Sequence, residues 1–212
     1  MPKHSFNPSS TGSWNRGCRI FSGRNALAIT GRPRCKGLPL LRGEKRRLSP
    51  FMRKLALSAA QSVLFNRYLA QRMADGLLHQ VLPGEVMGKY PAGGIFLAED
   101  VTVEQRRFDN REVVPAGPIF GRKMFAARDS AAQRETKILD EAGLTLEHFA
   151  GFGKLTQGTR RHNLVFLQDL KVEFEQTNVC LSFSLPSGSY ATVLLRELTK
   201  NPEGDDNQEE IV

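Results

Sequence analysis

The sequence predicts an α+β fold, with a helix-rich middle followed by an antiparallel unit. Apolar side chains recur at helical spacing through residues 48–73, where the inward-facing positions are Leu57, Ala60, Leu64, Phe65, Tyr68 and Leu69. Residues 170–176 and 179–185 instead alternate apolar and polar side chains with a period of two, which is typical of half-buried strands. A helical pattern followed by a strand pattern predicts the α+β class.

Short elements follow the first helix. Residues 77–100 are strand-like and are interrupted by Pro83-Gly84 and Gly93-Gly94. The front half of residues 101–124 has a helical pattern, and Pro115 to Gly121 are predicted to form a loop.

Two more helices are predicted before the strand-like runs begin. Ser130 and Gln133 have the spacing of a capping box, which would open a helix over residues 130–142. Gly143 stands where a glycine commonly closes a helix. Residues 144–152 then predict a further short helix.

Three strand-like runs follow, at residues 158–168, 170–176 and 179–186. In the second run one face carries Leu170, Val172 and Phe174, and the other carries Lys171, Glu173 and Glu175. A hairpin turn is predicted at Thr177-Asn178.

The last strand runs into a glycine-serine turn. Pro186 ends the strand, Gly188 allows the backbone to turn, and Ser187 or Ser189 would cap a helix that continues to Leu198. A turn that leads into a helix can present backbone N–H groups to an anion, and Tyr190 would offer a flat ring there. The alternative, which spacing alone leaves open, is an ordinary connection whose tyrosine packs in the core.

The net charge of +8 is unevenly distributed. Residues 1–54 hold 13 lysines and arginines and one acid, whereas residues 55–212 hold 17 basic and 21 acidic residues. Residues 1–40 are rich in Gly, Ser, Pro and Arg without a sustained period, so we expect a basic, disordered leader there. The acidic residues 201–212 are expected to form a disordered tail. Nucleic-acid binding through charge alone is therefore indicated only for the N-terminal quarter.

Several chemistries are disfavoured. The chain has no apolar run of about 18 residues that would span a membrane. It lacks the glycine-rich phosphate-binding motifs, and its four histidines are isolated, so metal ligation is not expected. Cysteines at 18, 35 and 180 show no metal or disulfide spacing, which fits a reducing cytoplasm.

Adjacent arginines, Arg160 and Arg161, follow Gly158-Thr159 and precede the first late strand. Forked guanidinium groups at such a junction suit contact with RNA phosphates. A solvated loop is the other interpretation, and the pattern alone does not choose between them.

Five segments resemble the TruD family of tRNA pseudouridine synthases when they are taken together and in order. They are "LSAAQSVLFNRYLAQR" (57–72), "PGEVMGKY" (83–90), "PAGPIFGRKM" (115–124), "GTRR" (158–161) and "FSLPSGSYATVLLREL" (183–198). The resemblance runs from about residue 41 to residue 199. It implies an enzyme that isomerises uridine 13 of tRNA to pseudouridine without metal or organic cofactor. It also implies that the target base leaves its stack.

The resemblance divides the chain and assigns roles. Residues 41–158 would be a helix-rich inserted domain of the TruD type, and residues 159–200 would return to the antiparallel sheet of the catalytic domain as a strand-hairpin-helix unit. The ring at Tyr190, with Gly188 and Ser189, would contact the flipped uridine. An aromatic ring stacked on a base contributes about 1–3 kcal/mol. Arg160 and Arg161 would contact the tRNA.

One expected residue has no counterpart. The catalytic aspartate of the family lies in a Gly-x-Lys-Asp context, and no Lys-Asp pair occurs in this sequence. No catalytic residue is therefore assigned. We expect the chain to resemble the C-terminal part of such an enzyme, inactive without a missing N-terminal half. The alternatives are a tRNA-binding remnant without chemistry and an unstable fragment.

Overall fold

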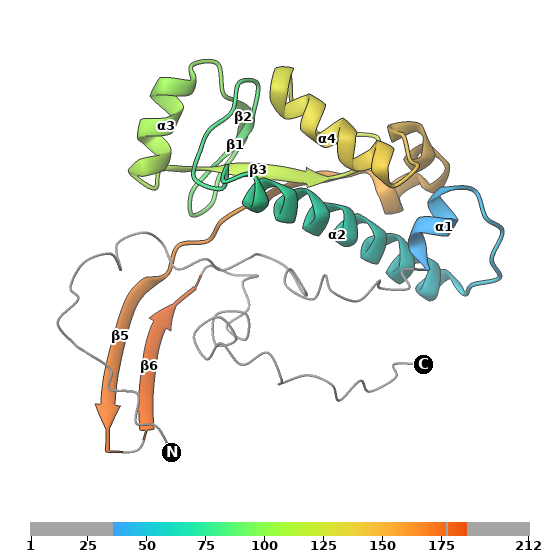
Figure 1. Cartoon of the computed structure of the whole chain (residues 1–212). Helices are drawn as coiled ribbons and strands as arrows, with labels where there is room; N and C mark the ends of the chain where they lie inside the picture. The colour runs from blue at the N-terminus through green and yellow to red at the C-terminus, as the bar shows by residue number, and fades with distance from the viewer. Residues whose placement is uncertain (1–35, 177, 186–212) are drawn as a thin grey trace. The chain divides into compact units, whose positions relative to one another are not determined.

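The computed structural model describes residues 36–176 and 178–185 (Figure 1). These residues form two compact units, which meet in sequence between Leu164 and Val165 and are described separately below. The first unit combines helices with a four-stranded antiparallel sheet, and the second is a two-stranded antiparallel hairpin. This architecture confirms the α+β class predicted from the sequence. No helix among the described residues is long and apolar enough to cross a membrane.

The long helix α2, Pro50–Ala74, follows the short helix α1, Gly37–Leu41. Ser49 caps α2, because its hydroxyl accepts a hydrogen bond from the Met52 amide at 3.3 Å. Pro50 occupies the first helical position, where a missing N–H costs nothing. All six residues of the predicted apolar stripe are buried, which confirms this helix: Leu57, Ala60, Leu64, Phe65, Tyr68 and Leu69.

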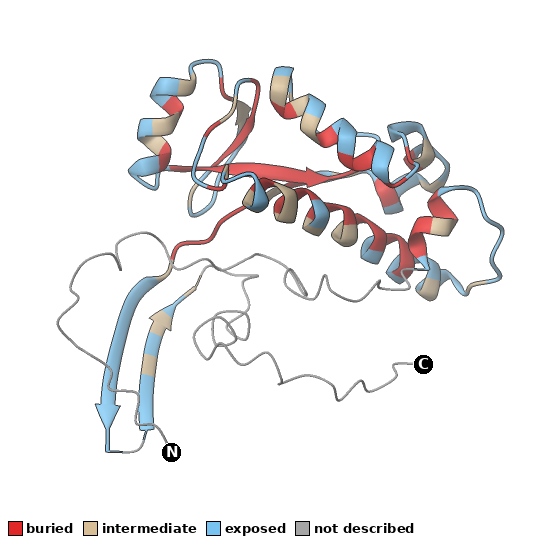
Figure 2. Cartoon of the chain, viewed as in Figure 1, coloured by how far each residue is buried: buried red, intermediate tan, exposed pale blue. Residues whose placement is uncertain are grey.

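The sheet of the first unit has the order β2-β1-β3-β4. Its strands are β1 (Val86–Lys89), β2 (Ile95–Leu97), β3 (Val113–Ile119) and β4 (Thr159–His162). Every pair is antiparallel. Figure 2 shows that β3 is buried along its whole length, so it is the central strand of the unit.

Strand β3 contradicts the loop predicted from Pro115 to Gly121. Its first half pairs with β1 and its second half pairs with β4. Asn163 N donates to Pro115 O at 2.9 Å, so residue 115 turns its backbone polar groups toward the β4 side, at the end of that strand. Backbone polar groups alternate sides along a strand, so the nitrogen of Pro118 points toward the β1 side. The pairing with β1 ends at Pro115, so no β1 partner stands opposite that nitrogen. Neither missing N–H therefore breaks a ladder.

Three further helical elements complete the first unit. They are α3 (Val101–Asp109), α4 (Asp129–Glu141) and the 3₁₀ segment η1 (Leu146–Thr156). Helix α4 and its closing glycine confirm the prediction, because Gly143 has φ +63°. The predicted capping box is wrong, since Ser130 donates to Pro83 O at 3.4 Å and the cap residue Arg128 makes no side-chain bond.

Helices α2 and α4 lie on opposite faces of the sheet (Figure 1). A Cβ added to Gly117 of β3 would meet the rings of Tyr68 and Phe65 of α2 at 2.8 and 2.9 Å. The helix therefore packs directly on the strand, and only glycine fits at residue 117. One apolar core joins α1, α2, α4 and η1, and it includes Leu41, Leu57, Leu64, Phe120, Ile138, Leu144 and Phe149.

The second unit pairs β5 (Gln168–Glu175) with β6 (Asn178–Ser184). Asn178 already pairs with Glu175, so the turn begins one residue earlier than predicted. Thr177 lies outside the described residues. Every described residue of β5 is exposed, including the apolar row Leu170, Val172 and Phe174 at 42, 45 and 73%.

Candidate nucleic-acid interface

Four of the five segments that carry the family resemblance come together in the first unit. Residues 83–90 contain β1, residues 115–124 contain most of β3, and residues 158–161 open β4. Residues 57–72 lie within α2, which packs on this sheet. The fifth segment, residues 183–198, lies almost wholly outside the described residues.

Glycines in these segments serve close packing. A Cβ on Gly121 would meet the backbone nitrogen of Gly158 at 2.2 Å, and a Cβ on Gly158 would meet that of Gly121 at 2.7 Å. The turn after β3 and the turn before β4 therefore approach too closely for any side chain. A Cβ on Gly88 would likewise meet Nε2 of His162 at 2.4 Å.

The two adjacent arginines of β4 point to opposite faces of the sheet. Arg160 pairs with Pro118 and Arg161 pairs with Gly117. Gly117 faces α2, so Arg161 faces α2 as well, and Arg160 faces α4. The doublet therefore cannot act as a single forked phosphate clamp.

Arg160 is buried and fully engaged. Both of its terminal nitrogens contact the Glu135 carboxylate of α4, Nη2 at 3.1 Å from Oε2. Its Nε donates to Phe125 O at 2.7 Å, and Nη1 donates to Ala116 O at 3.3 Å. Only 1% of the side chain is exposed. This geometry corrects the prediction for Arg160, which ties β4 to α4 and leaves no surface for a phosphate.

Burial sets the charge state of this pair. Desolvation raises the pKa of the Glu135 carboxyl, while the hydrogen bonds and charge of Arg160 lower it. Burial is the larger effect, so the pKa of the Glu135 carboxyl lies above its ordinary value.

Arg161 is half-buried, and its guanidinium carbon lies 5.2 Å from the centroid of the Phe65 ring. This is a cation–π contact. Arg161 is less buried than Arg160. Of the two predicted RNA contacts, Arg161 therefore remains the candidate.

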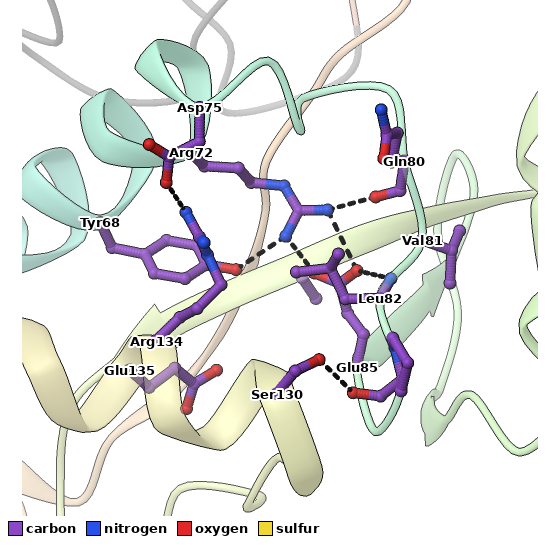
Figure 3. A network of polar contacts seen from close by, with 12 residues as sticks. Tyr68, Arg72, Asp75, Gln80, Val81, Leu82, Glu85, Ser130, Arg134 and Glu135 are labelled. Atoms are coloured by element: carbon purple, nitrogen blue, oxygen red, sulfur yellow. Dashed lines mark hydrogen bonds and ion pairs between the residues drawn. The ribbon is translucent and has the colours of Figure 1, made fainter.

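A second buried ion pair lies on the α2 side (Figure 3). Arg72 near the end of α2 donates to Glu85 Oε2 at 3.0 Å and to the Tyr68 hydroxyl at 3.2 Å. Glu85 Oε2 also accepts from the Leu82 amide at 2.9 Å. The side chains of Arg72 and Glu85 are 0 and 3% exposed. Burial raises the pKa of the Tyr68 hydroxyl. This network fixes the start of β1 on α2.

Sequence reasoning missed both buried ion pairs, although a signal was present. Arg72 stands four residues after Tyr68, on the apolar stripe of α2. Glu135 stands four residues after Ala131, among the buried positions of α4. A charged residue on a buried stripe requires a buried partner.

His162 ends β4 against Gly88, and its ring centroid lies 6.0 Å from that of Tyr90. Desolvation lowers the pKa of this histidine, so the ring is neutral at physiological pH. Among the described residues, no group of three or more metal-binding side chains is found. Gly188, Ser189 and Tyr190 lie outside the described residues, and their role stays a prediction.

Residues 42–198 match the family model of tRNA pseudouridine synthase D (TruD). The chain belongs to the TruD family. The tRNA pseudouridine synthase D of Anaeromyxobacter dehalogenans 2CP-C is 40% identical over 194 residues, which cover 87% of this chain and 55% of that protein. A protein of the same name from Thermus thermophilus is 37% identical over 185 residues, covering 87% and 51%.

A crystal structure of a Methanosarcina mazei protein that carries the TruD name has a similar fold. Its TM-score is 0.60 at 23% identity, over 80% of this chain and 42% of that chain. The likeness supports the TruD fold. The chain spans about half the length of the curated relatives it matches.

Proposed function

We propose that this chain is part of a tRNA pseudouridine synthase of the TruD type, which isomerises uridine 13 of tRNA to pseudouridine. The observation that carries the proposal is the match of residues 42–198 to the family model. The relatives described above are named for tRNA, so tRNA is the proposed partner.

The proposed roles follow the two units. The inserted domain was predicted over residues 41–158. Because β4 pairs with β3 of the first unit, we propose that this domain extends to residue 164 and that its Arg161 contacts a phosphate. Residues 165–185 would belong to the catalytic sheet. The exposed apolar row of β5 supports this assignment, because an isolated two-stranded hairpin is marginal until further strands or a helix cover it.

The chemistry requires a base that has left its stack and an aspartate that helps to break its C–N bond. The ring of Tyr190 would stack on the flipped uridine, next to Gly188 and Ser189. Since the sequence has no Lys-Asp pair, we propose that these 212 residues bind tRNA but need a segment that carries the aspartate. A tRNA-binding protein without chemistry is the second candidate, and the missing pair favours it.

Release of tritium from carbon 5 of uridine in labelled tRNA tests the proposal. The chain alone should release none, and the chain mixed with the N-terminal half of a TruD relative should release it. A tRNA with cytidine at position 13 is the control and should release none in the mixture. Release by the chain alone would show that a carboxylate here replaces the missing one. If the mixture is folded and binds tRNA but releases no tritium, the result would favour a tRNA-binding protein without chemistry.

A further inference from the structure

A groove of about 540 Å³ opens beside the N-terminal end of α2. Six residues from α2, the loop before it and η1 line its walls: Leu48, Pro50, Phe51, Arg53, Lys54 and Leu155. Four of these are apolar, and the two charged residues are both basic. Such walls fit a ligand that combines a flat apolar group with negative charge.

Phe51 supplies the flat surface. Its side chain is 72% exposed, although it sits beside the apolar Leu155, which is itself 39% exposed. The ring is therefore not needed to fill the core of the unit. An exposed aromatic ring of this kind can stack on a nucleobase, whatever the base.

Positive charge surrounds the ring. Within residues 43–54 five exposed side chains are basic: Lys45, Arg46, Arg47, Arg53 and Lys54. The one acid in this stretch, Glu44, is paired with Arg46 at 3.2 Å. The helix amides contribute little, because Pro50 has no N–H and Ser49 occupies the Met52 amide. The side chains therefore determine the binding preference of the groove.

We propose that this groove binds a loop nucleotide of the RNA, with its base on Phe51 and the adjacent phosphates on Arg53 and Lys54. Proteins recognise RNA mainly at such unstacked nucleotides, on aromatic and arginine side chains. A second copy of the chain fits poorly, because a symmetric contact would bring two sets of these cations together.

The groove would be a second contact, separate from Arg161. Phe51 and Phe65 are 14 residues apart on α2, which is about 21 Å along the helix axis. A stacked strand spaces its nucleotides by about 3.4 Å, so about six nucleotides would separate the two contacts. The inference rests on the proposed function, in that the RNA is tRNA.

Fluorescence anisotropy of a labelled, unmodified tRNA transcript tests the proposal on the full chain. Phe51→Ala should weaken binding about tenfold, whereas Phe51→Trp should keep the affinity because it keeps a ring. Replacing both Arg53 and Lys54 by glutamine should reduce the slope of log K against log salt by about 1.4. A thermal melt of each variant should match the parent, since these side chains are exposed.

Matched controls come from α3, at the other end of the unit (Figure 1). Val103 is 46% exposed, and Arg106 is an exposed cation on the same helix. Val103→Ala and Arg106→Gln should leave tRNA affinity unchanged. An unlabelled oligouridylate should compete for the groove, and a blunt duplex of the same length should compete much less.

Three results would overturn the inference. In the first, the parent binds tRNA and all Phe51 variants bind it equally well, which leaves the proposed function standing. In the second, Phe51→Ala lowers self-association in sedimentation rather than RNA binding, so the groove is a protein contact. In the third, the parent does not bind tRNA at all, which would remove the proposed function as well. Tritium release tests that function independently.

Discussion

Replacing Arg160 by glutamine should lower the free energy of unfolding of the first unit by about 4 kcal/mol. The side chains of Arg160 and Glu135 are 1 and 9% exposed, so the substitution leaves a carboxylate where water does not reach it. Removing one partner of a buried ion pair typically costs about 3–5 kcal/mol. Loss of the 3.3 Å bond to Ala116 O also removes a partner from a buried carbonyl.

Urea unfolding followed by far-ultraviolet circular dichroism measures this loss, with Lys137→Gln as the matched control. Lys137 and Glu141 lie 3.9 Å apart with side chains 59 and 54% exposed. An exposed pair of this kind contributes about 0.3–0.5 kcal/mol at most, so the control should unfold almost as the parent does.

The pH dependence of the variant identifies the cause. Burial already raises the pKa of Glu135 above its ordinary value of 4.5, and loss of the cation raises it further. The folded variant then takes up a proton at a pH where the unfolded chain stays ionised. Its stability therefore increases as pH falls toward 4.5, and the difference from the parent shrinks.

One result would refute the structural role of Arg160. If Arg160→Gln unfolds like the parent but binds tRNA more weakly and with a smaller salt slope, the arginine contacts RNA. Arg161→Gln provides the comparison, since the half-buried Arg161 should affect the salt slope of tRNA binding more than stability.

Three further predictions concern packing, pH and local stability. Gly121→Ala should lower the free energy of unfolding by about 2–3 kcal/mol, because the added Cβ would lie 2.2 Å from a backbone nitrogen. Gly151→Ala is the control in the same urea assay and should change the free energy of unfolding little, because the space around Gly151 is open. Burial lowers the pKa of His162 below 6.5, so the unchanged chain should lose stability as pH falls below 6.5. Its melting temperatures at pH 7.5 and 5.5 should therefore differ more than those of the His162→Gln variant. Limited proteolysis should cut residues 165–185 before residues 50–162, because β5 is exposed throughout, and equal protection of both would contradict this.

The sequence predicted the long helix well because one physical signal dominates it. Apolar side chains on a 25-residue helix must face the sheet, and their period of 3.6 residues is unambiguous over that length. The strands of residues 77–100 and the hairpin after residue 168 were also predictable, since turns separate them clearly. Only the position of the hairpin turn differed, by one residue.

Strand β3 was not predictable from its residues alone. Pro115 and Pro118 would disrupt a strand that pairs on both sides along its full length. They are tolerated because β1 and β4 each pair with about half of β3, and this arrangement depends on partners 24–28 and 40–46 residues away in the sequence.

The candidate site was predicted only in part. Side chains alternate along a strand, so Arg160 and Arg161 must point to opposite faces of the sheet. The sequence could therefore have shown that the two arginines do not act together on one face. It could not show which of them is buried, because that depends on the position of Glu135 in α4. The placement of the charged residues on the helical stripes was the missed indication.

An arginine doublet in a short strand also creates an ambiguity during folding. If β4 slipped by one residue, Arg161 would stand opposite Pro118 and could satisfy Glu135 in place of Arg160. Stability of the ion pair alone does not exclude this misfolded register. The slip would place His162 opposite Gly117 and against Phe65, where Arg161 now lies, and would separate the closely apposed backbones of Gly121 and Gly158. The close contact between Gly121 and Gly158 therefore favours the native alignment of β4 over the slipped one.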